Sequence, residues 1–230
     1  MRRRQLTLAL GAPLLAGALA GLGACATPAT DGAGLWFIFL ESGRPTPDDR
    51  DAVMAMQRGH IDNFKRLFGE GKLLAAGPMA DPARSKRGLV VVRAASHAEL
   101  MGYFQPDAYV REGYMQVNAV PALARRAVYT EGIDATRVEE IRIVLIGRPA
   151  AAPDAATAHA RQALLQGLVE RGNVGAWYTL QTGPVAEVLL ARGTDSASLE
   201  AALAPYAAPD RGITVQVWRQ WISPGVVGPR

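Results

Sequence analysis

One histidine of the sequence lies where an ionisable side chain could do chemistry. Apolar residues recur at Val53, Met56, Phe64 and Leu67 with the period of a helix face, and His60 continues that face. Imidazole changes its charge near neutral pH, so a histidine on a half-buried helix can act as a general base. A histidine that only packs at the helix edge fits the same spacing, and spacing alone favours packing.

Other kinds of catalytic site find no support in the sequence. The single cysteine, Cys25, lies at the end of an export-type segment, and no serine occupies a nucleophile-elbow pattern. His60, His97 and His159 lack the spacing of metal ligands, and no glycine-rich phosphate loop is present. We therefore expect neither a metal nor a cofactor.

The charge of the chain argues against nucleic-acid binding. The formal net charge is +4, but Arg2, Arg3 and Arg4 lie in the segment that we expect to be removed. Without these three, 22 Lys and Arg stand against 21 Asp and Glu, a net charge of about +1. The remaining sequence shows no basic stripe, which a nucleic-acid surface would require.

The first residues have the layout of a secretory signal: a positive start, an apolar run and small residues before the cut. Leu22-Gly23-Ala24-Cys25 resembles a bacterial lipobox. We therefore predict a lipoprotein signal peptide over residues 1–24, a lipid on Cys25 and a flexible tether over residues 25–34. An ordinary cleaved signal with an incidental cysteine is the alternative.

The lipid would hold a soluble body on a membrane of the cell envelope, facing the periplasm. Ala26 stands where an aspartate retains enteric lipoproteins at the inner membrane, so by analogy we expect the outer membrane. Arg3-Arg4 also fits a twin-arginine signal, and the choice between Sec and twin-arginine export stays open.

Residues 35–129 read as a β-α-(β)-β-α-β unit. The predicted strands are 35–43, 73–79, 88–96 and 116–120, and the predicted helices are 49–69, 97–104 and 108–112. Asp48 or Asp49 is the expected cap of the first helix. This order is typical of an α+β unit with helices on one face of an antiparallel sheet.

Residues 139–224 repeat this order at a spacing of about 100 residues, after a linker over residues 130–138. Gly43-Arg44-Pro45 recurs as Gly147-Arg148-Pro149. A chance match of a common order is the alternative to duplication. Because one such unit leaves an apolar sheet face uncovered, we predict an α+β fold of tandem ferredoxin-like α+β barrel units packed sheet to sheet as an intrachain pseudo-dimer.

The first half resembles the YCII-related (YciI-like) family. The resemblance rests on His60, on the run Gly71-Lys72-Leu73-Leu74-Ala75-Ala76-Gly77-Pro78-Met79, and on Asp107-Ala108-Tyr109-Val110 with Gly113 close behind. It implies ferredoxin-like barrels that pair through their sheets. Relatives in aromatic-compound breakdown eliminate chloride or isomerise lactones. One departure is Ala108, because the family usually has proline there, whereas here Pro106 precedes the aspartate.

The resemblance also implies a catalytic pair, His60 and Asp107. We expect Tyr109 together with Gly77, Pro78 and Met79 to bind the substrate. Each residue has a plainer interpretation that stays open: Asp107 caps the helix that begins at Ala108, Tyr109 packs, and Gly77-Pro78 forms a turn.

The second half lacks this motif set. Aligning Gly71 with Gly172 places Arg161 opposite His60, while His159 falls on another face of the helix. We therefore expect the second half to serve as the packing partner of the first.

These observations favour a lipid-anchored YCII-like envelope protein that binds a small organic molecule. The expected reaction is cofactor-free proton transfer, in an isomerisation or elimination, by His60 and Asp107. The alternative is a non-catalytic ligand-binding or protein-interaction lipoprotein, with a cofactor-free oxygenase as a third idea by analogy with related barrels. Further self-association of the pseudo-dimer stays open.

Overall fold

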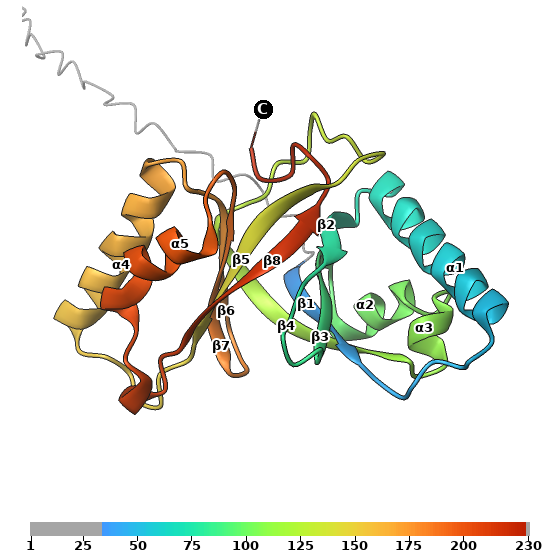
Figure 1. The fold of residues 1–230 in the computed structure, drawn as a ribbon, viewed down its shortest axis with the longest axis horizontal. Helices are drawn as coiled ribbons and strands as arrows, with labels where there is room; N and C mark the ends of the chain where they lie inside the picture. The colour runs from blue at the N-terminus through green and yellow to red at the C-terminus, as the bar shows by residue number, and fades with distance from the viewer. Residues whose placement is uncertain (1–33, 229–230) are drawn as a thin grey trace, which may run out of the picture. The chain divides into compact units, whose positions relative to one another are not determined.

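A mixed α+β fold with one antiparallel sheet of eight strands forms residues 34–228, the part of the chain that the computed structural model describes (Figure 1). The predicted signal peptide, Cys25 and all but the last residue of the predicted tether lie outside these residues. The strands are β1 Gly34–Ser42, β2 Leu73–Pro78, β3 Lys86–Ala94, β4 Met115–Arg126, β5 Glu139–Gly147, β6 Val174–Leu180, β7 Val185–Ala191 and β8 Val215–Ile222.

The helices follow the strands in the same order in each half. They are α1 Arg50–Gly69, α2 His97–Tyr103, α3 Ala108–Arg111, α4 Ala155–Glu170 and α5 Ser196–Leu203, with short 3₁₀ turns η1 Ala204–Tyr206 and η2 Pro209–Arg211. None of the helices within residues 34–228 has the length and apolar character needed to span a bilayer.

The strand order of the sheet is β2-β3-β1-β4-β6-β7-β5-β8, so the second half repeats the order of the first. β4 joins the halves because it pairs with β1 as far as Pro121 and with β6 from Ala122 onward. At the other end, Met79 forms an antiparallel bridge with Gln220, and the amide of Ala80 donates to the carbonyl of Arg219. The two edge strands therefore meet, which gives an α/β barrel-like fold.

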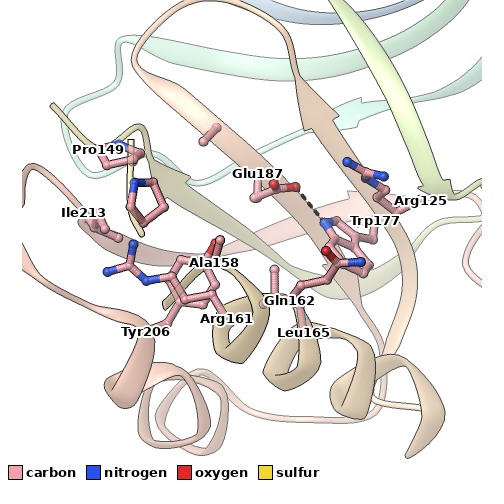
Figure 2. A pocket seen from close by; sticks show the side chains of 13 residues that line it. Arg125, Pro149, Ala158, Arg161, Gln162, Leu165, Trp177, Glu187, Tyr206 and Ile213 are labelled. Carbon is pink, nitrogen blue, oxygen red and sulfur yellow. Dashed lines mark hydrogen bonds between the residues drawn. The ribbon is translucent and has the colours of Figure 1, made fainter. Parts of the chain in front are cut away.

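Alternation along the strands divides the apolar residues into a central core and two helix-facing cores. Phe37 and Phe39 of β1 lie in the central core, which also receives Tyr178 from the second half. The alternate residues of β1, Ile38 and Leu40, point to the other face and pack in the core under α1, α2 and α3. A third core lies between α4, α5 and the second half of the sheet, beside a cavity of about 240 Å³ (Figure 2).

The first helix follows the sequence pattern closely. α1 begins after Asp49, whose side chain accepts hydrogen bonds from the amides of Asp51 and Ala52. Beyond its end, Gly71 takes a left-handed φ of 68° and closes the last turn on Phe68. The cap at Asp49 and the end near Gly69 are confirmed.

Two strands differ from the expectation. β4 extends to Arg126, well past the predicted end at Val120, because Pro121 lies where the pairing changes from β1 to β6. The carbonyl of Pro121 accepts from the amide of Gln181, beside the start of the pairing with β6. β6 fills the place of β2 in the repeated order, but its own residues were not assigned to a strand. Gly175 lies inside this strand and weakens the strand pattern of the sequence. A glycine is required there because a Cβ would lie 2.0 Å from the carbonyl oxygen of Val227.

Candidate functional site

His60 and Asp107 are hydrogen-bonded to each other. Nδ1 of His60, on α1, lies 2.5 Å from Oδ2 of Asp107, the residue that precedes α3. The side chain of Asp107 is completely buried and that of His60 is 12% exposed. As a carboxylate, Asp107 can only accept, so the proton of the imidazole lies on Nδ1 and the lone pair on Nε2.

Asp107 also caps the short helix that follows it. Its Oδ1 accepts the amide of Tyr109 at 3.0 Å, while its Oδ2 faces His60. The two oxygens thus serve the helix cap and the histidine separately. The expected cap is confirmed, and it fixes the direction in which Oδ2 points.

Two aromatic rings surround the imidazole. The ring of Phe64 lies 4.4 Å from that of His60 between centroids, and the ring of Tyr109 meets it edge-on at 5.8 Å. The hydroxyl of Tyr109 donates to the carbonyl of Val53 at 3.3 Å, so Tyr109 fastens the α3 segment to α1. Among the hydrogen bonds of residues 34–228, none uses Nε2 of His60.

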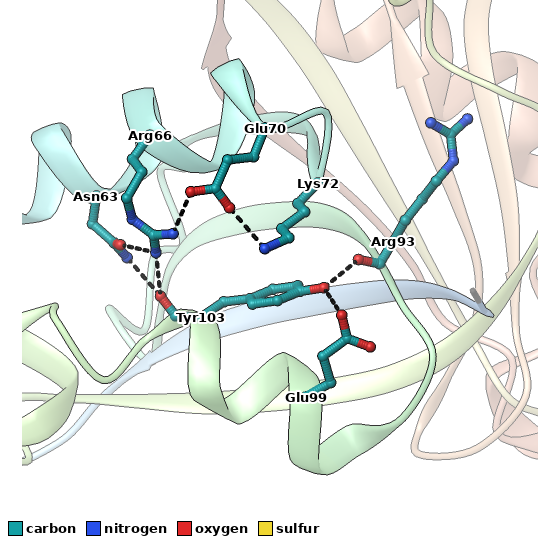
Figure 3. A network of polar contacts seen from close by, with 7 residues as sticks. All are labelled: Asn63, Arg66, Glu70, Lys72, Arg93, Glu99 and Tyr103. Atoms are coloured by element: carbon teal, nitrogen blue, oxygen red, sulfur yellow. Dashed lines mark hydrogen bonds and ion pairs between the residues drawn. The ribbon is translucent and has the colours of Figure 1, made fainter. Parts of the chain in front are cut away.

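A polar network holds α1 at a fixed distance from α2 and the segment after it (Figure 3). Nδ2 of the buried Asn63 donates to the carbonyl of Tyr103 at 3.0 Å, and Nη2 of Arg66 donates to Oδ1 of Asn63 at 2.7 Å. The hydroxyl of Tyr103 donates to Glu99 at 2.6 Å, and burial raises the pKa of Tyr103. Since Asn63 follows His60 by one turn and Tyr103 precedes Asp107 by four residues, the network sets the spacing of the pair.

The motif Gly77-Pro78-Met79 divides between the two faces of the sheet. Ala76 packs on the core under α1, so Pro78, two residues later, faces the same side and is exposed there. Gly77 faces β8, where a Cβ would lie 1.8 Å from the carbonyl oxygen of Trp221. Met79 lies in the central core. The structure therefore brings Tyr109 to His60 and places Gly77 and Met79 on the opposite face.

A second group of polar side chains lies in the second half, which the sequence presented as a packing partner. Arg161, Trp177, Glu187 and Tyr206 line the cavity between α4 and the sheet. The carboxylate of Glu187 accepts from Nε1 of Trp177 at 2.7 Å and from the hydroxyl of Thr179 at 2.9 Å. A lone carboxylate in the otherwise apolar run Val185–Ala191 is the sequence signal that could have indicated this site.

Within residues 34–228, no three His, Cys, Asp or Glu side chains gather closely enough to hold a metal ion.

Comparison with protein-family models gives no match for this chain, and comparison with curated proteins gives none either. Solved structures give remote similarities. A candidate monooxygenase from Lactobacillus acidophilus NCFM has a TM-score of 0.47 and 10% identity, covering 82% of this chain and 93% of that chain. A candidate monooxygenase from Fusobacterium nucleatum has a TM-score of 0.47 and 7% identity, covering 83% and 92%. The siroheme decarboxylase NirDL has a TM-score of 0.48 and 6% identity, covering 86% and 73%. These similarities are too weak to carry any property of those proteins over to this chain.

Proposed function

We propose that residues 35–129 bind a small carbonyl-bearing organic molecule and transfer a proton on it, with His60 as the base. The observation that carries the proposal is the hydrogen bond between Nδ1 of His60 and the buried Asp107. This bond directs the lone pair of Nε2 away from the carboxylate and stabilises the positive charge that forms when Nε2 takes a proton.

The proposed step needs no cofactor. Nε2 of His60 removes a proton from the carbon next to the carbonyl, and the electron pair of that C–H bond moves into the carbonyl to give an enolate. In an isomerisation, the enolate is conjugated with a neighbouring C=C bond, and the imidazolium returns the proton to the far carbon of that bond, which shifts the double bond toward the carbonyl. In an elimination, a leaving group departs from the neighbouring carbon with its electron pair, and the proton passes to solvent.

We further propose that this half is a YCII-like domain and that the chain is a tandem duplication forming an intrachain pseudo-dimer. One support is the repeated strand order, β2-β3-β1-β4 in the first half and β6-β7-β5-β8 in the second. The other is the shared central core, in which Phe37 of the first half lies 5.7 Å from Tyr178 of the second half between ring centroids. A duplicated unit can keep one site and change the other, which leaves His60 in one half only.

The lipobox-like end at Cys25 supports a lipid-anchored protein of the cell envelope. In this proposal, replacing Cys25 with serine abolishes labelling by a fatty-acid analogue and releases the protein from membranes. A serine variant that still takes up the label would contradict the lipid anchor while leaving the proposed site in residues 35–129 untouched.

A deuterium-exchange screen tests the proposed reaction across several classes of carbonyl compound. The purified full-length protein is incubated in D₂O with a panel of small ketones, lactones and β-chloro carbonyl compounds, and proton NMR follows loss of the signal next to each carbonyl. We expect at least one compound to exchange faster than in buffer, and the His60→Gln variant to lose this acceleration while it stays folded. Exchange at the buffer rate across the panel would leave the non-catalytic ligand-binding or protein-interaction lipoprotein as the better account.

A further inference from the structure

The second half contains a cavity whose size fits a single-ring molecule. Its volume is about 240 Å³, and it lies between α4, β6, β7 and the segment that carries η1 (Figure 2). For scale, an engineered apolar cavity of about 150 Å³ holds benzene. Trp177, Tyr206, Pro149, Leu165 and Ile213 give this cavity much of its lining, so it offers flat aromatic and apolar surfaces to a ring.

The charged groups of the cavity favour an anion. The charged residues that line it are two arginines, Arg125 and Arg161, and one glutamate, Glu187. Burial raises the pKa of Glu187, against the hydrogen bonds from Trp177 and Thr179, so its negative charge is disfavoured. The positive charges therefore exceed the negative charge in the cavity, and a carboxylate ligand would balance them.

Arg161 has a free guanidinium to offer. Its central carbon lies 5.3 Å from the centroid of the Tyr206 ring, and the hydrogen bonds and ion pairs of residues 34–228 include none from Arg161. A guanidinium held over a ring keeps its hydrogen-bonding edge for a bidentate partner, and carboxylate is the partner that matches its geometry. Figure 2 shows Arg161 and Tyr206 at one end of the cavity and Glu187 with Trp177 at the other.

Arg161 stands at the position of α4 that His60 occupies in α1. Gly71 and Gly172 both take left-handed φ values, 68° and 78°, and each closes its helix with the same pair of backbone hydrogen bonds. Arg161 precedes Gly172 by the distance in sequence at which His60 precedes Gly71. In each half this helix position faces the segment after the second helix: Asp107 in the first and Tyr206 in the second.

We propose that the second half is a separate binding site for a small cyclic carboxylate, held by Arg161 at its carboxylate and by Trp177 and Tyr206 at its ring. Both hydrogen bonds that Glu187 accepts within residues 34–228 end on Oε2, so Oε1 is available to a hydroxyl group at the far end of the ring. This site is independent of the reaction proposed for His60. It also gives the second half a role beyond packing.

Calorimetric titration tests the site with benzoate, 4-hydroxybenzoate and cyclohexanecarboxylate, and with the carboxamide of each acid as the uncharged control. On the full-length protein we expect saturable binding of the acids and at least tenfold weaker binding of the amides. Arg161→Gln should weaken the acids about ten- to hundredfold, whereas Arg171→Gln, at the exposed end of α4, and His60→Gln should leave them unchanged.

A second variant separates loss of the binding site from loss of the fold. Ala158→Trp adds an indole at an α4 position that lines the cavity and keeps every charge, so it should abolish binding of the acids while the unfolding midpoint stays near that of the parent protein. Equal binding of acids and amides, binding that survives both Arg161→Gln and Ala158→Trp, or no saturable binding of any acid would overturn the proposal.

Discussion

Nδ1 of His60 and Oδ2 of Asp107 lie 2.5 Å apart although 47 residues separate them in the chain. The contact joins the middle of α1 to the N-terminus of α3, and the other oxygen of Asp107 is occupied by the amide of Tyr109. A carboxylate that is fixed on both oxygens holds the imidazole in one tautomer and one orientation. The arrangement is that of a positioned base, and it allows direct tests.

Asp107→Asn should change the tautomer of His60 without removing the helix cap. Asparagine caps helices about as well as aspartate, so α3 should remain. Its amide group can donate to Nδ1, which would move the imidazole proton to Nε2 and remove the lone pair from the substrate side. Long-range ¹H–¹⁵N correlation spectra of the histidines should show an Nδ1–H form in the parent protein and an Nε2–H form in the variant. The same tautomer in both proteins would contradict this prediction.

Asn63→Ala should loosen the spacing between α1 and α2. The change removes a buried hydrogen bond to the carbonyl of Tyr103 and frees the partner of Arg66, which should lower the free energy of unfolding by roughly 1–3 kcal/mol. Urea unfolding measures the loss. Asp62→Ala is the matched control on the same helix, because its side chain is 73% exposed and its ion pair with Lys65 is 3.8 Å long. An equal effect of the two changes would show that the Asn63 network is not what holds the helices.

Glu187→Gln should change how stability depends on pH. Burial raises the pKa of Glu187 above its ordinary value of 4.5, so the folded state binds the proton more tightly than the unfolded state does. The resulting stabilisation is fully present below pH 4.5 and is lost as pH rises through the raised pKa of the folded state. The parent protein should therefore lose stability relative to Glu187→Gln over this window, as urea unfolding at several pH values can measure. Glu200→Gln, at an exposed position of α5, is the control and should follow the parent curve; parallel curves for parent and Glu187→Gln would contradict the prediction.

The elements that local patterns specify could be predicted from the sequence. The cap at Asp49 and the left-handed Gly71 are local signals, and they bound α1 correctly. The length of β4 could not be predicted, because its residues after Pro121 are held by β6, far away in the chain. A proline usually indicates that a strand ends or lies at an edge. Here the strand continues past Pro121, because its hydrogen-bond partners come from a distant part of the chain.

The two candidate sites also differ in how far the sequence could predict them. The position of His60 on its helix face follows from periodicity, but its partner came from family resemblance. The substitution of Ala108 for the family proline left the orientation of Asp107 open. The structure shows that orientation to be set by the cap on Tyr109, which needs only the aspartate and a helix start. The cavity of the second half brings Arg161, Trp177 and Tyr206 together from separate elements, so the lone carboxylate of Glu187 in an apolar strand was its one local signal in the sequence.

The most direct test of the account is the rate of deuterium exchange on the most reactive compound of the carbonyl panel, measured for four proteins side by side. We predict that His60→Gln lowers the rate by about 100-fold or more, since a positioned general base contributes about 10²–10⁴-fold. Asp107→Asn should give a comparable loss, because the Nε2–H tautomer has no lone pair to take the proton. His97→Gln, which replaces an exposed histidine at the start of α2, should exchange at the parent rate. Equal rates for the parent protein and His60→Gln, with both proteins folded, would contradict the claim that His60 is the base.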